Sequence, residues 1–83
     1  MTKGLIVYTN GKDEHGNDIC QACRLTKTMI ESKRLPYTEI DISADHKSAD
    51  LLRAAGHLEL PVVVTGNDVW TGFRPDKIRG LHG

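Results

Sequence analysis

The chain lacks an excess of charge of either sign, and it lacks a long apolar run. Its 83 residues include 11 Lys and Arg against 11 Asp and Glu, so the formal net charge is zero. A neutral chain gives no electrostatic reason to expect nucleic acid or an anionic membrane as a partner. No apolar stretch approaches the ~20 residues of a membrane span, and the stretch 5–8 is too short for the core of a signal peptide. We therefore expect a cytoplasmic protein.

Length and composition restrict the architecture. The chain is about half as long as a typical domain, so we expect one domain that spans residues 1–83. A content of 39% hydrophobic and 27% charged residues is typical of a compact core rather than of a disordered tail. No apolar stripe remains once the expected elements are packed, which favours a monomer.

Cysteine is scarce, and its spacing is informative. The two cysteines are Cys20 and Cys23, separated by Gln21 and Ala22. A disulfide between them closes a very short loop, worth about 2 kcal/mol in the loop-entropy model, so it would be a poor structural staple. In a chain expected to remain in a reducing compartment, this spacing indicates redox chemistry.

Apolar periodicity predicts alternating strands and helices. The apolar and β-branched runs predict strands over 5–9, 37–42, 61–65 and 69–71. Three- and four-residue spacing predicts a helix over 20–33, a second helix with Ser43 as N-cap and Gly56 as its stop, and a short helix from Pro75 to near Gly80. This order predicts an α/β fold with one mixed four-stranded sheet, in which a crossover makes one pair parallel and a closing hairpin makes another antiparallel.

The same patterns predict which side chains face the core. In the first helix we expect Ala22, Met29 and Ile30 to pack inward, together with Leu25 or Thr26, while these charged residues point elsewhere: Arg24, Lys27, Glu31 and Arg34. Asp18 is expected to cap or charge the start of that helix. In the second helix the residues expected inward are Leu51, Leu52 and Ala55.

The predicted elements place Cys20 at the start of the first helix, directly after the loop that follows the first strand. The unpaired amide N–H groups and the dipole of a helix start favour a thiolate, which is the nucleophilic form of cysteine. Cys23 lies about one helical turn further on. We expect Cys20 to attack a substrate disulfide and Cys23 to attack the resulting mixed disulfide, which releases the reduced substrate.

Metal binding is the alternative use for a cysteine pair. Structural zinc needs four ligands, and the further candidates here are His15, His46, His57 and His82. None of them forms a closely spaced histidine pair, and His15 would supply at most a third ligand. We expect all four to be surface residues and no metal site, with a non-catalytic metal-binding module as the lesser alternative.

Four segments resemble the NrdH redoxins, which are glutaredoxin-like proteins of thioredoxin fold that reduce ribonucleotide reductase. The resemblance runs from about residue 5 to 81 and is carried by Ile6-Val7-Tyr8-Thr9, Cys20-Gln21-Ala22-Cys23, Leu60-Pro61-Val62-Val63 and Trp70-Thr71-Gly72-Phe73-Arg74-Pro75-Asp76-Lys77-Ile78. It implies a thioredoxin-like fold of order β-α-β-α-β-β-α with three helices around the sheet. It also implies a thiol–disulfide oxidoreductase without a bound cofactor, which takes electrons from NADPH through thioredoxin reductase.

The resemblance further implies roles for particular residues. Cys20 would be the attacking thiol and Cys23 the resolving one. The Leu60–Pro61 peptide bond would be cis, which would place Pro61 beside the dithiol and leave the Leu60 backbone free to pair with an extended substrate segment. A surface that docks protein partners would include Gln21 and Ala22 over the dithiol, together with Trp70, Phe73 and Arg74.

Other interpretations of these residues stay open. As core residues, Trp70 and Phe73 would seal the last helix against the sheet, which is the usual place of lone aromatic residues, and for Phe73 we favour the core. Arg74 and Asp76 could form an ion pair at the helix start. Glutathione is the alternative reductant, but Pro75 removes a backbone donor that a glutathione carboxylate could have used.

Two features depart from the NrdH pattern. The loop 10–19 is longer than the turn usual before the first cysteine, and it carries three carboxylates, Asp13, Glu14 and Asp18. Acidic groups there oppose a nearby thiolate, although solvent screens them. We favour an inert insertion over a role in partner choice. The pair Gln21-Ala22 also differs from the commoner choices, so the reduction potential is not predicted.

Overall fold

The computed structural model describes residues 4–11, 13–16, 19–57, 59–66 and 68–81. The elements follow one another as β1 (Ile6–Thr9), α1 (Gln21–Ser32), β2 (Thr38–Asp41), α2 (His46–Ala54), β3 (Val62–Val64), β4 (Val69–Thr71) and α3 (Pro75–Arg79). This order confirms the predicted alternation of strands and helices. Each strand begins and ends within one residue of its predicted limits.

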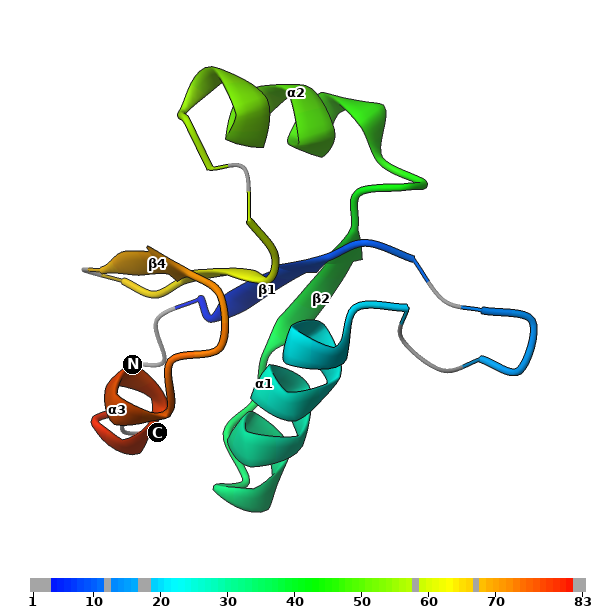
Figure 1. Cartoon of the computed structure of the whole chain (residues 1–83). Helices are drawn as coiled ribbons and strands as arrows, with labels where there is room; N and C mark the ends of the chain where they lie inside the picture. Colours follow the sequence, from blue (N-terminus) through cyan, green and yellow to red (C-terminus); the bar gives the residue numbers. More distant parts are fainter. Residues whose placement is uncertain (1–3, 12, 17–18, 58, 67, 82–83) are drawn as a thin grey trace.

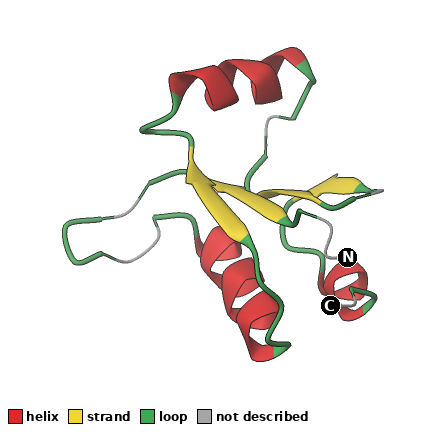
Figure 2. Cartoon of the chain, turned by 180° about the vertical axis from the view of Figure 1, so that it is seen from behind, coloured by secondary structure: helices red, strands yellow, loops and turns green. Residues whose placement is uncertain are grey.

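The four strands form one mixed sheet in the order β2-β1-β3-β4. β1 runs parallel to β2 and antiparallel to β3, and β3 and β4 form an antiparallel pair. Helices α1 and α3 lie on one face of the sheet and α2 lies on the other (Figures 1 and 2). The predicted parallel pair and closing antiparallel pair are therefore confirmed, and the architecture is a thioredoxin-like fold.

The main core lies between the sheet and the face covered by α1 and α3. It consists of five residues that are at most 6% exposed: Val7, Ile30, Val63, Trp70 and Ile78. Burial of one large apolar side chain contributes about 1.5–3 kcal/mol, so this cluster holds both helices on the sheet. Alternation along β1 puts Val7 and Thr9 on this buried face.

The start of helix α2 differs from the prediction in its N-cap and in its first residue. Its N-cap is Asp45, whose side chain accepts a hydrogen bond from the Ser48 amide, and not Ser43. Ser43 lies in a turn after β2, because its amide and hydroxyl both donate to the carboxylate of Asp41. The helix therefore starts at His46, later than predicted.

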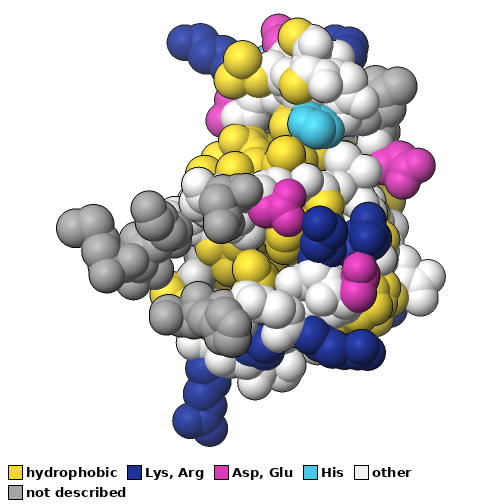
Figure 3. Space-filling model, turned by 90° about the vertical axis from the view of Figure 1, so that its left-hand side faces the viewer, with side chains coloured by type: hydrophobic (Ala, Val, Ile, Leu, Met, Phe, Trp, Pro, Cys, Tyr) yellow, Lys and Arg dark blue, Asp and Glu magenta, His cyan; other side chains and the backbone are white. Residues whose placement is uncertain are grey.

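The packing of α2 also differs from the prediction. Only Leu52 of the three residues expected inward is buried, while Leu51 is 69% exposed and Ala55 is exposed. Leu51 lines a shallow, largely apolar hollow together with Lys47, Asp50 and Ala54. Figure 3 shows apolar side chains gathered between α2 and the sheet below it. Successive residues of a helix lie about 100° apart around its axis, so Leu51 points away when Ser48 and Leu52 form the buried face.

Helix α1 spans nearly the predicted range, but one of its charged residues lies elsewhere than expected. Arg24, Glu31 and Arg34 are exposed as predicted. Lys27 is buried on the same face as Cys23, Thr26 and Ile30. The prediction for Lys27 was wrong, because its ammonium group forms an ion pair with the part-buried carboxylate of Glu39. None of the described helices is both long and apolar enough to cross a membrane.

Candidate active site

Cys20 is the N-cap of α1. Its backbone is extended (φ −86°, ψ 113°), and its Sγ accepts a hydrogen bond from the backbone N–H of Cys23 at 3.3 Å. The sulfur thus occupies the place at which a serine or aspartate oxygen satisfies an amide at a helix start. The predicted cap, Asp18, lies outside the described residues.

The two cysteines differ sharply in exposure. Cys20 is half-buried, whereas Cys23, in the first turn of α1, is 0% exposed. Both are present as thiols rather than as a disulfide. Ile19, which directly precedes Cys20, is an apolar residue that is 67% exposed. One sulfur is therefore within reach of a partner, and the other lies one turn behind it.

The Leu60–Pro61 segment lies against the dithiol. The peptide bond between these residues is cis, as predicted. The Cys20 thiol donates to the Leu60 carbonyl at 3.6 Å, which places this segment beside the exposed sulfur. Pro61 is fully buried. Residues 40 positions apart in sequence thus meet at the carboxyl end of β1 and the start of β3.

A turn after β4 supports this segment from the other side. The Gly72 amide donates to the Pro61 carbonyl at 2.8 Å, and Gly72 has a φ of +78°. In this region of backbone space a side chain costs about 1–2 kcal/mol, so glycine suits the position. Gly72 belongs to the stretch 70–78, which resembles the NrdH redoxins, and this stretch is therefore hydrogen-bonded to the backbone beside the dithiol.

The predicted docking residues on this segment occupy different environments. Trp70 is a core residue at 6% exposure, and Phe73 is half-buried and packs against the core. Arg74 is exposed. Over the dithiol, Gln21 is exposed and Ala22 is half-buried. The structure brings Leu60 and Pro61 to Cys20, while the partner-contact role of all these residues stays a prediction.

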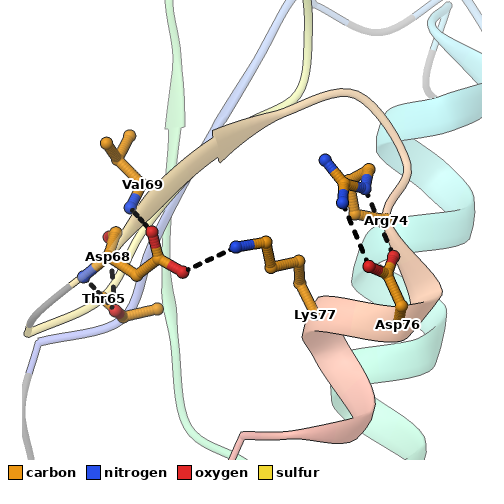
Figure 4. Close-up of polar contacts among 6 residues, drawn as sticks. All are labelled: Thr65, Asp68, Val69, Arg74, Asp76 and Lys77. Carbon is orange, nitrogen blue, oxygen red and sulfur yellow. Dashed lines mark hydrogen bonds and ion pairs between the residues drawn. The ribbon is translucent and has the colours of Figure 1, made fainter.

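Two ion pairs surround the start of α3 (Figure 4). Arg74 donates through Nε and Nη2 to the carboxylate of Asp76, at 3.2 and 3.0 Å, which confirms the predicted ion pair. These hydrogen bonds lower the pKa of Asp76 and raise that of Arg74. Lys77 donates to Asp68 at 3.1 Å, and this hydrogen bond lowers the pKa of the Asp68 carboxyl. Lys77 thereby connects α3 to the β3–β4 turn.

Sequence reasoning missed a polar cluster beneath the dithiol. The Lys27 ammonium and the Thr9 hydroxyl both donate to Oε2 of Glu39, each at 2.9 Å. Thr9 ends β1, Lys27 is on α1 and Glu39 is on β2. The available signal was a lysine four residues after Cys23, on the face of the helix that carries the apolar residues.

Among the histidines that the structure describes, none joins Cys20 and Cys23 in a set of metal ligands. His15 and His46 are exposed, His57 is half-buried, and His82 lies outside the described residues. Across the described ranges, no group of three or more His, Cys, Asp or Glu side chains is arranged to hold a metal ion.

The thioredoxin-like sheet and the Cys-x-x-Cys pair at the start of α1 define the class of protein as a thiol–disulfide oxidoreductase. The glutaredoxin family model matches residues 5–70. The solved structure of a glutaredoxin from Archaeoglobus fulgidus superposes with a TM-score of 0.70 at 18% identity, covering 93% of this chain and 83% of that one. At that identity the likeness concerns the fold alone.

Closer relatives narrow the class. The glutaredoxin-like protein NrdH of Salmonella typhimurium is 41% identical over 63 residues, and that of Escherichia coli K12 is 40% identical over the same length. Each match covers 76% of this chain and 78% of the relative. The solved E. coli NrdH-redoxin superposes with a TM-score of 0.84 at 34% identity, covering 95% of both chains. The chain belongs to the glutaredoxin family, in its NrdH group.

Proposed function

We propose that this protein is a cytoplasmic, monomeric dithiol protein that donates electrons to ribonucleotide reductase. Thioredoxin reductase then reduces its Cys20–Cys23 disulfide with electrons from NADPH. The observation that carries the proposal is the unequal placement of the two sulfurs. Cys20 is reachable at the amino end of α1, and Cys23 is enclosed one turn behind it. Because negative charge is favoured at the amino end of a helix, the position of Cys20 suits an attacking thiolate.

The reaction then proceeds in two exchanges. The Cys20 thiolate attacks a disulfide of the partner, forms a mixed disulfide and expels one partner thiolate. Cys23 loses its proton and attacks the Cys20 sulfur of that bond, which expels the second partner thiolate and leaves a Cys20–Cys23 disulfide. Two electrons pass to the partner, which gains two protons as its thiolates are protonated. The protein itself supplies the electrons, so no bound cofactor is required.

The surroundings of Cys20 suit an extended partner segment. Leu60 and Pro61 border the sulfur on one side, and Gln21 and Ala22 lie between the cysteines at the helix start. We assign these four residues to the partner contact. The Leu60 backbone would pair with the partner main chain next to its disulfide. Phe73 and Arg74, on the segment that supports Pro61, would extend this contact.

Two features support thioredoxin reductase over glutathione as the source of electrons. Helix α3 begins with Pro75, which supplies no N–H for a glutathione carboxylate. The guanidinium of the neighbouring Arg74 already forms an ion pair with Asp76. In addition, the E. coli NrdH-redoxin is described as a glutaredoxin-like protein with a thioredoxin-like activity profile.

The test compares two reducing systems with the same protein and the same disulfide substrate. NADPH oxidation is followed with thioredoxin reductase, and separately with glutathione and glutathione reductase. We expect turnover with the first system, and none with the first system when Cys20→Ser replaces the wild type. Turnover with glutathione alone would overturn the proposed electron source. The final step is then tested with ribonucleotide reductase as the disulfide substrate, where deoxyribonucleotide formation is expected.

A further inference from the structure

The buried polar cluster beneath the dithiol has no part in the exchange described above. It consists of Lys27, Glu39 and Thr9, joined at one carboxylate oxygen. The side chains of Lys27 and Glu39 are only 10% and 24% exposed. Removal of charged groups from water is costly, and a buried ion pair is weak evidence for stability on its own. A charged pair kept at this depth therefore calls for another explanation.

The position of the pair relates it to Cys23. Lys27 follows Cys23 by four residues on the buried face of α1, so the two side chains are neighbours on the helix surface. Long side chains on a helix lean toward its amino end, which directs Lys27 over the turn that holds Cys23. Glu39 approaches from the opposite side, from β2, where it pairs in register with the core residue Val7 of β1.

Cys23 must lose a proton inside the molecule before it can attack the mixed disulfide. A thiolate in an enclosed site is disfavoured unless a positive charge lies close to it. Lys27 is the charged residue on the buried face of α1, one turn beyond Cys23, and the carboxylate of Glu39 holds its ammonium in place at 2.9 Å. We propose that the Lys27–Glu39 pair sets the rate of the resolving step, with Lys27 stabilising the Cys23 thiolate and Glu39 moderating that effect. This inference rests on the proposed roles of the two cysteines.

Several other charged groups on the elements around α1 have partners of their own. On the same face of β2, Asp41 accepts hydrogen bonds from the amide and hydroxyl of Ser43. On α3, which packs against α1, Asp76 is paired with Arg74 and Lys77 with Asp68. β1 contributes Val7 and Thr9 to this face, neither of which is charged. Lys27 and Glu39 are thus the charged pair that the described part of the chain places one helical turn from Cys23.

The test separates the two exchanges by using 5,5′-dithiobis(2-nitrobenzoate). Attack by Cys20 releases one thionitrobenzoate and leaves the other on Cys20. Attack by Cys23 then releases the second as the Cys20–Cys23 disulfide forms and the Cys23 proton passes to the buffer. Stopped-flow absorbance resolves the two releases as successive phases. The first phase reports the attack by Cys20, and the second reports the resolving step across a range of pH.

The proposal predicts opposite effects of the two partners. Lys27→Met should slow the second phase about tenfold at neutral pH and raise its pH midpoint by about one unit. Lys27→Arg, which keeps the charge, should restore both. Glu39→Gln should accelerate the second phase and lower its midpoint, and it provides an independent test if Lys27→Met does not fold. Thr9→Val, which removes one hydrogen bond and no charge, is the matched control.

The possible failures are distinguishable. Equal second phases in the wild type, Lys27→Met and Glu39→Gln would overturn the inference while leaving the proposed function intact. Equal slowing in Lys27→Met and Lys27→Arg would also overturn it, because that result indicates packing rather than charge. An absent first phase in the wild type would instead refute the proposed role of Cys20.

Discussion

Replacement of Gly72 by alanine tests how the structure holds the Pro61 segment beside the dithiol. Gly72 has a φ of +78°, and among the described residues a Cβ there would meet Oε2 of Glu59, at an ordinary 3.5 Å. The expected cost therefore comes from the backbone conformation, about 1–2 kcal/mol. In a domain of this length each kcal/mol lowers the melting temperature by about 4–8 °C, so Gly72→Ala should melt about 4–16 °C below the wild type.

Thermal unfolding followed by circular dichroism measures this shift. The matched control is Gly4→Ala, because a Cβ at Gly4 meets none of the residues that the structure describes within 4 Å and its φ lies outside the left-handed region. The control should melt close to the wild type. Because the Gly72 amide donates to the Pro61 carbonyl, we also expect slower reduction of a protein disulfide by Gly72→Ala. If Gly72→Ala and Gly4→Ala melted at the same temperature, the backbone argument would be refuted.

Two further predictions concern the core and α2. Ile30→Ala removes a fully buried side chain and should cost about 2–5 kcal/mol in urea unfolding, whereas the exposed Leu51→Ala should cost less than about 0.5; equal losses would contradict the assigned core. Hydrogen bonds from Ser48 lower the pKa of Asp45 in the folded chain. Their stabilisation is therefore complete above the ordinary carboxyl pKa and is lost as pH falls through the folded value. Asp45→Ala should melt below the wild type at neutral pH, and this gap should close in acid; a pH-independent gap would contradict the capping role.

The order of the elements and the position of the dithiol were predictable from the sequence. The spacing of apolar residues indicates the strands and helices, and Cys20 and Cys23 lie where a loop becomes a helix. The second N-cap was not predictable, because Ser43 and Asp45 are both good caps. The choice between them depends on the turn that Asp41 makes with Ser43 after β2. That turn is a local contact that apolar periodicity does not report.

Long-range pairing limited the prediction of the site. A pattern of apolar positions treats a lysine as a surface residue, so Lys27 was assigned to the wrong face of α1. Its partner Glu39 comes from β2, and only the register of β1 against β2 brings Glu39 close to Thr9 and Lys27. The cis bond at Leu60–Pro61 was predicted from family resemblance, since the residues themselves favour trans.

The division of labour between the sulfurs is tested most directly by trapping the covalent intermediate. Each single variant, Cys20→Ser and Cys23→Ser, is mixed with a disulfide-containing partner, and the captured species are identified by peptide mass spectrometry. Cys23→Ser should accumulate a mixed disulfide through Cys20, whereas Cys20→Ser should capture almost none. Equal capture by the two variants, or capture through Cys23 alone, would contradict the account.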